Sequence, residues 1–233
     1  MKARNLLMLI PMALLLALAA CSGGGEAVSG KIKGDRSFDK GDYTGSIEHY
    51  RKYLEIELGA ADVWLAQYMM ARAYYESEDY PTAALEFEIF QRNYPRSDSL
   101  EAAAYYEALC WFQQSPKYDR DSTPTHQALR KLDEYMLDYP SGQYLEAARG
   151  KIAVLNDKLA RKTLSIAQFY HRLNRLDAAV LYYEKLLREQ PESSLVGKAL
   201  EEFEQLRRDQ GRVSEAEELA NLRARWMPPP GAP

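Results

Sequence analysis

Few residues in this 233-residue chain have side chains suited to catalysis or metal binding, because it contains only three histidines and two cysteines. His49, His126 and His171 lie far apart, with no cysteine or carboxylate at metal-ligand spacing around them, so we predict no metal site. The chain also has no Gly-rich phosphate loop, no G-x-S-x-G and no H-E-x-x-H motif. We therefore predict no catalytic residues, no cofactor and no enzyme activity.

Cys21 is the residue with a clear chemical signal. It follows Lys2, Arg4 and an apolar run over residues 6–20, a pattern typical of a secretory signal. The run of fifteen residues is shorter than the ~20 that a membrane-spanning helix needs. The sequence Leu-Ala-Ala-Cys at residues 18–21 resembles the lipobox of bacterial lipoproteins, where cleavage precedes the cysteine and acyl chains are attached to it.

We therefore expect residues 1–20 to be a lipoprotein signal peptide, Cys21 to be lipidated and residues 21–30 to form a flexible tether. Ser22 after the cysteine favours the outer membrane, with the body facing the periplasm. The alternative is a plain signal peptide with an incidental cysteine. Cys110 lies in an apolar helical stretch, and we expect a buried free thiol there.

Composition and charge exclude several classes of protein. The formal net charge is −4 and the pI is near 5.6, which argues against a nucleic-acid partner. The composition is that of an ordinary soluble protein and excludes collagen-like, disordered and multi-span membrane classes. Two cysteines cannot form a disulfide framework.

The body repeats itself from residue 31 onward. Gly34, Ala71 and Ala108 are spaced 37 residues apart, and small residues recur twelve positions after the first two, at Ser46 and Ala83. This register resembles the tetratricopeptide repeat (TPR), a helix-turn-helix unit of about 34 residues. Further positions of that unit are the turn, at Gly41, Glu78, Asn174 and Gly211, and a ring or leucine between repeats, at Tyr50, Phe87, Leu132 and Tyr183.

The sequence therefore predicts an all-α fold, a solenoid over residues 31–226 with about five repeats and ten or eleven helices. The expected repeats are 27–60, 64–97, 101–142, 160–193 and 197–226, and residues 227–233 form a Pro-rich disordered tail. Two insertions break the period. A polar loop falls within residues 113–124, and residues 143–156 form a longer or additional helix. Such additions carry function in some solenoids and are tolerated growth in others.

Positions 5, 9 and 12 of the first helix of each repeat face the groove of such solenoids. An arginine among aromatic rings at these positions would pair with a carboxylate while the rings hold apolar side chains. This predicts a peptide-binding groove. The alternative is that the rings pack between neighbouring helices. The predicted groove residues are Phe38, Tyr68, Arg72, Tyr75, Tyr105, Leu109 and Phe112.

The chain resembles the BamD family of lipoproteins, which belong to the outer-membrane β-barrel assembly machine. The segments that carry this resemblance are Ala-Ala-Leu-Glu-Phe-Glu-Ile-Phe-Gln-Arg-Asn-Tyr-Pro at residues 83–95 and residues 135–141, 159–170 and 174–179. The enlarged third repeat and the extra helix before the fourth also match.

The resemblance implies a binding subunit rather than an enzyme. Its implied partners are a BamA-type β-barrel insertase, other lipoproteins of the machine and unfolded outer-membrane proteins, whose C-terminal signals the N-terminal repeats would receive. It also implies contact with the membrane through the lipid anchor only. We expect the insertase contact within residues 168–212. The alternatives are a periplasmic TPR scaffold for cell-wall synthesis or secretin assembly, and an enzyme that uses carboxylates in the groove.

Overall fold

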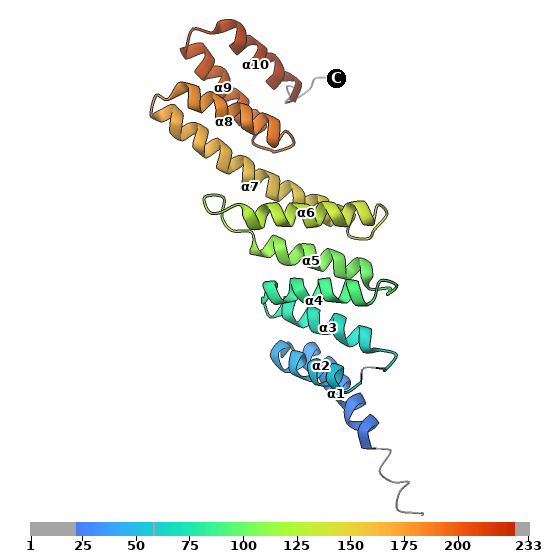
Figure 1. Cartoon of the computed structure of the whole chain (residues 1–233). Helices are drawn as coiled ribbons and strands as arrows, with labels where there is room; N and C mark the ends of the chain where they lie inside the picture. The colour runs from blue at the N-terminus through green and yellow to red at the C-terminus, as the bar shows by residue number, and fades with distance from the viewer. Residues whose placement is uncertain (1–21, 58, 227–233) are drawn as a thin grey trace, which may run out of the picture. The chain divides into compact units, whose positions relative to one another are not determined.

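The computed structural model describes residues 22–57 and 59–226, and these residues form helices joined by turns and short loops (Figure 1). The described residues confirm the predicted all-α fold. They contain ten helices, the lower of the two expected numbers. The signal peptide, Cys21 and the tail at 227–233 lie outside the described residues. The ten helices are α1 (Ser22–Asp39), α2 (Tyr43–Ile56), α3 (Val63–Glu76), α4 (Tyr80–Asn93), α5 (Leu100–Gln114), α6 (Thr123–Asp138), α7 (Leu145–Arg172), α8 (Leu176–Glu189), α9 (Val196–Asp209) and α10 (Val213–Trp226).

The chain divides into two compact units within α5, between Ala103 and Ala104. In the first unit, α1 packs on α2, α2 on α3 and α3 on α4 (Figure 1). Small residues stand where paired helices meet, and the Ser46 hydroxyl donates a buried hydrogen bond of 3.0 Å to the Gly34 carbonyl. Burial of such an unpaired hydroxyl would be costly, so this bond allows serine at the position.

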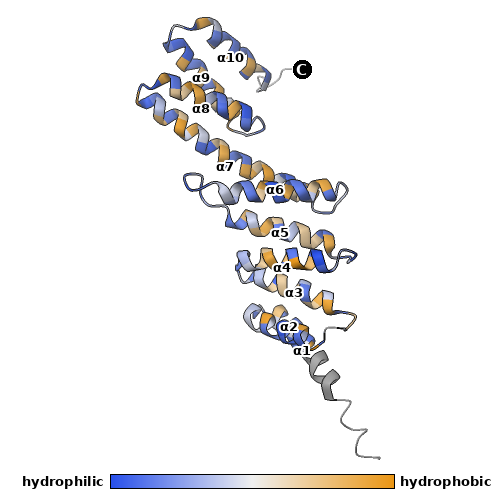
Figure 2. Cartoon of the chain, viewed as in Figure 1, coloured by the Kyte–Doolittle hydropathy of each residue, from blue (hydrophilic) through white to orange (hydrophobic). Residues whose placement is uncertain are grey.

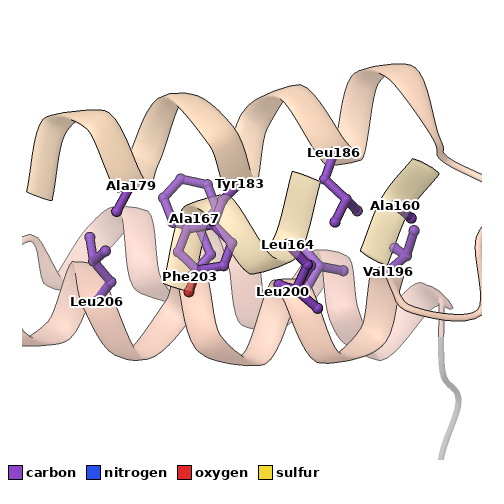
Figure 3. Close-up of a cluster of buried hydrophobic side chains, with 11 residues drawn as sticks. Ala160, Leu164, Ala167, Ala179, Tyr183, Leu186, Val196, Leu200, Phe203 and Leu206 are labelled. Carbon is purple, nitrogen blue, oxygen red and sulfur yellow. The ribbon is translucent and has the colours of Figure 1, made fainter. Parts of the chain in front are cut away.

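The second unit packs in the same way, with α7 on α8, α8 on α9 and α9 on α10. A hydrophobic core of this unit lies between α7, α8 and α9, where Tyr183 stacks on Phe203 with ring centroids 5.4 Å apart (Figure 3). Hydropathy alternates along each of these helices (Figure 2), because apolar residues recur at helical spacing and form a buried face. Burial of that face against its neighbours stabilises the repeat array.

Four turns within repeats share one backbone conformation. Their central residues have a positive φ: 75° at Gly41, 65° at Glu78, 54° at Asn174 and 72° at Gly211. The N–H of each central residue donates to the carbonyl three residues earlier, as from Gly41 to Phe38. The N–H of the following residue donates to the carbonyl five residues earlier, as from Asp42 to Ser37. All these bonds are 2.9–3.0 Å long. This pattern satisfies carbonyls at the helix end and requires the left-handed conformation that glycine adopts most readily.

The two insertions take different forms. Residues 115–122 form a loop between α5 and α6 that is bonded to α7. The Lys158 ammonium donates to the Ser115 carbonyl and hydroxyl at 3.1 and 2.8 Å, and the Lys162 ammonium donates to the Arg120 carbonyl and the Ser122 hydroxyl at 2.7 and 2.9 Å. The second insertion lengthens α7 to 28 residues, so of the two expected forms, a longer helix or an additional helix, the chain has the first.

The start of α1 differs from expectation, because its helix begins at Ser22 and covers residues 22–30, where composition suggests a flexible tether. Within the described residues, no helix combines the length and apolar character needed to cross a membrane.

Candidate functional site

Tyr68 lies inside the first unit rather than on its surface. Its exposed fraction is 8%, and its ring centroid lies 6.1 Å from that of Phe87 and 5.5 Å from that of Phe90, both on α4. These contacts are edge-on or tilted, as expected for aromatic rings packed in a core. Tyr68 therefore has the geometry of the packing alternative.

Arg72 lies one turn further along α3 and is partly exposed. Its Nη2 atom is 3.1 Å from Oε1 of Glu76, and the two side chains are 23% and 32% exposed. This ion pair joins residues four apart on one helix, and its partial exposure to water limits its strength. A guanidinium in this position has donors that suit a carboxylate of another chain.

Two aromatic rings of the first unit are partly exposed. Tyr75 packs edge-on against Tyr80 with centroids 5.5 Å apart. Phe38, at the end of α1, packs edge-on against Tyr43 at 5.4 Å. Such rings retain apolar surface for a ligand side chain while their neighbours hold them in place.

Several polar side chains of the first repeat are paired with one another. The Tyr50 hydroxyl donates to Oδ1 of Asp35 at 2.6 Å, and Lys31 pairs with Oδ2 of the same carboxylate at 3.1 Å. Burial, together with the hydrogen bond to Asp35, raises the pKa of Tyr50 well above its ordinary value. Tyr50 therefore remains a neutral donor, and Asp35 is engaged by two groups of its own chain.

The predicted groove residues of the second unit contact neighbouring groups. Tyr105 is 6% exposed and stacks on Tyr144 with centroids 4.4 Å apart. Leu109 is 9% exposed. The Lys151 ammonium lies 4.5 Å from the centroid of the Phe112 ring, a cation–π distance. Tyr144 and Lys151 belong to the inserted segment, so this insertion contacts two of the predicted groove residues of the third repeat, Tyr105 and Phe112.

Arg72 and Tyr75 are therefore the predicted groove residues in α3 that keep exposed surface, and Glu76 is a neighbour outside the predicted groove positions. The spacing of four residues between Arg72 and Glu76 was a signal that could have identified it. The arrangement offers a cation, a carboxylate and ring surface together. Chemically it can bind a peptide carboxylate with an adjacent apolar side chain. Among the described residues, no cluster of His, Cys, Asp and Glu could hold a metal ion.

A different surface lies in the second unit, within the region expected to contact an insertase. Phe169 is 49% exposed, Leu173 55% and Leu181 58%. Arg172 and Arg175 are exposed beside them. Phe169 and Leu173 are four residues apart at the end of α7, and exposed apolar side chains with charged neighbours are typical of protein contact sites.

A comparison with protein families matches residues 32–222 to a family model described as YfiO, outer membrane lipoprotein. Three relatives named outer membrane protein assembly factor BamD come from Caulobacter vibrioides, Vibrio cholerae and Neisseria gonorrhoeae. The Caulobacter relative is 27% identical over 70% of this chain and 53% of its own length. The Vibrio relative is 26% identical over 55% of this chain and 58% of its own. The Neisseria relative is 24% identical over 77% of this chain and 75% of its own. The chain thus spans little more than half the length of the first two.

Among solved structures, the fold is similar to the "TPR2AB-domain:pHSP90-complex of yeast Sti1", with a TM-score of 0.51 and 16% identity over 87% of this chain and 78% of that one. At this identity the likeness concerns the fold, and it confirms the predicted tetratricopeptide solenoid class.

Proposed function

Because the chain belongs to the YfiO family of outer membrane lipoproteins, to which the BamD resemblance pointed, we propose that it is a non-catalytic subunit of the outer-membrane β-barrel assembly machine. The observation that carries this proposal is the family match over residues 32–222, joined by relatives named as BamD assembly factors. The long α7, which the resemblance implies, supports it further.

Membrane attachment is the first part of the proposal. Lipidation at Cys21 would hold the protein on the outer membrane with its helices in the periplasm. Cells grown with an alkyne-tagged fatty acid should incorporate the tag into the protein, and Cys21→Ser should abolish it and release the protein from the membrane fraction. Cys110→Ala is the matched control, because that cysteine is buried, and it should keep both properties. A tagged, membrane-bound Cys21→Ser protein would contradict lipidation at this site.

The second part is scaffolding of a BamA-type insertase by residues 168–212. The exposed side chains of Phe169 and Leu173 support this choice. A photo-crosslinking amino acid placed at either position should capture the insertase in intact cells. Leu85 is similarly exposed, at 53%, on α4 of the first unit, and the same probe there should not capture it. Equal crosslinking from both units would contradict the assignment.

The third part is recognition of C-terminal signals of unfolded outer-membrane proteins through Arg72. Charge reversal, Arg72→Glu, should weaken binding of a peptide from a β-barrel C-terminus at least about tenfold, because the carboxylate would lose its partner and meet a like charge. Arg92→Glu, on an exposed site of α4, makes the same charge change and should leave affinity nearly unaltered. Fluorescence anisotropy with a labelled peptide measures both. Equal affinity in all three proteins would contradict the role of Arg72.

A scaffold for another envelope process is the remaining candidate. Affinity isolation of the lipidated protein from detergent-solubilised outer membranes, followed by mass spectrometry, separates the two. We expect stoichiometric recovery of a large barrel with repeated periplasmic domains. Recovery of cell-wall enzymes or a secretin without that barrel would favour the alternative.

A further inference from the structure

Arg72, the proposed carboxylate partner, is already paired with a carboxylate of its own helix. Glu76 is the last residue of α3, and its Oε1 atom lies 3.1 Å from Nη2 of Arg72. Both side chains keep part of their surface in water, at 23% and 32% exposure. An incoming carboxylate therefore approaches a guanidinium edge that Glu76 occupies.

The position of Glu76 at the end of α3 makes its ion pair with Arg72 contribute little to stability. A negative charge at the C-terminal end of a helix faces the unfavourable pole of the helix dipole. The last turn of α3 has no basic residue to offset this charge, so Arg72, one turn earlier, supplies the opposite charge. An ion pair of this kind, partly open to water, contributes little to folding. Removal of the Glu76 charge should therefore leave the helix intact.

We propose that Glu76 is an intramolecular competitor that lowers the affinity of Arg72 for peptide carboxylates. A ligand must displace Glu76 from Nη2, and a carboxylate alone gains little by replacing one pair with another. A ligand that also places an apolar side chain against the partly exposed Tyr75 ring gains the additional contact. Every carboxylate meets the same cost of displacing Glu76, and a chain with an apolar C-terminal residue offsets part of that cost through its contact with Tyr75. This inference rests on the proposed function of Arg72.

The test uses Glu76→Gln in the full chain and two forms of one β-barrel C-terminal peptide, with a free carboxylate or a C-terminal amide. We expect about two- to fivefold tighter binding of the free acid by the variant than by the natural chain, from the loss of one partly exposed ion pair. Affinity for the amide should stay within about twofold. A merely structural role of Glu76 would change both peptides alike.

Glu134→Gln is the matched control. Arg130 and Glu134 form another Arg–Glu pair four residues apart, on α6, with 2.5 Å between Nη1 and Oε1. Its removal makes the same charge change and should leave both affinities unaltered. Thermal unfolding followed by circular dichroism verifies that both variants fold.

The outcomes distinguish the competitor role of Glu76 from the proposed binding of peptides by Arg72. If the free acid binds in an Arg72-dependent way and Glu76→Gln does not tighten it, the competitor role is wrong and the peptide site stands. Equal tightening of acid and amide also overturns the competitor role. If neither peptide binds the natural chain or the variant, the peptide site itself is wrong and the competitor role fails with it. Binding of the acid by the variant alone supports the competitor role.

Discussion

Gly34 lies directly against the ring of Tyr50, so that a Cβ atom on Gly34 would stand 2.7 Å from Cε1 of that ring. The ring is fully buried and has little room to move. Gly34→Ala should therefore lower the free energy of unfolding by about 1–3 kcal/mol, the usual cost of overpacking. Urea unfolding measures it. Gly150 is the control, because no atom lies within 4 Å of its added Cβ. Gly150→Ala, at an exposed position of α7, should raise the free energy of unfolding by up to about 1 kcal/mol.

The left-handed turn residues give a second prediction. Glu78 has a φ of 65°, where a side chain is disfavoured, so Glu78→Gly should raise the free energy of unfolding by about 1 kcal/mol. Asn174→Gly should raise it less, because asparagine tolerates this conformation. Conversely, Gly41→Ala and Gly211→Ala should each be destabilising by about 1 kcal/mol, although open space surrounds both sites. A stabilised Gly41→Ala would show that φ does not govern these turns.

Asp157 predicts a dependence of stability on pH. Burial alone would raise the pKa of Asp157, but hydrogen bonds from the Ser194 and Ser193 side chains and the Ser194 N–H outweigh it, so the pKa lies below its ordinary value. A lowered carboxyl pKa in the folded state stabilises the fold above the unfolded-state pKa, about 4, and this contribution is lost as pH falls through the folded-state pKa.

Asp157→Asn should thus be less stable than the natural chain at pH 7 by about 1 kcal/mol, a modest value because water screens this carboxylate. The difference should shrink as pH falls below about 4. Urea unfolding at a series of pH values measures it. A difference that is constant down to pH 2 would rule out the charge as its cause.

The contacts of Lys158 and Lys162 predict the behaviour of the loop at residues 115–122. Lys158→Met with Lys162→Met removes four hydrogen bonds that α7 donates to this loop. Faster hydrogen exchange and faster proteolysis should follow within the loop while the helices keep their protection. Lys185→Met, at an exposed pair on α8 with 3.8 Å between charges, should change neither. Equal loop exchange in both variants would contradict the anchoring.

Cys110 predicts a contrast between folded and unfolded chains. Burial, with a smaller contribution from Glu107, raises the pKa of this thiol well above its ordinary value. The thiolate is the reactive form, so at pH 8 iodoacetamide should modify Cys110 at least about a hundredfold more slowly in the folded protein than in urea. Peptide mass spectrometry follows the modification. Comparable rates would mean that the thiol is reached in the native state.

Spacing in the sequence predicted the interior well because each repeat imposes the same contact. Ala71, Ala83, Ala108 and Ala179 are all fully buried, as the register requires. The turn position was equally predictable, since Gly41, Glu78, Asn174 and Gly211 all have positive φ. Repetition made these positions visible, because one packing geometry recurs at a fixed interval.

The groove was less predictable, because its exposure depends on residues outside the register. Tyr144 and Lys151, which cover Tyr105 and Phe112, come from the inserted segment, for which no repeat position exists. Burial of Tyr68 depends on the rings of Phe87 and Phe90, and a helix period alone does not specify how such rings share space.

The long α7 has a mechanical consequence within the second unit. Asp157, Lys158 and Lys162 lie within two turns of one helix, yet the first holds the segment between α8 and α9 and the other two hold the loop between α5 and α6. Two connections from different repeats are thus held by the same stretch of α7. We therefore expect a protein that binds one of these connections to restrict the motion of the other, because both are hydrogen-bonded to the same stretch of helix.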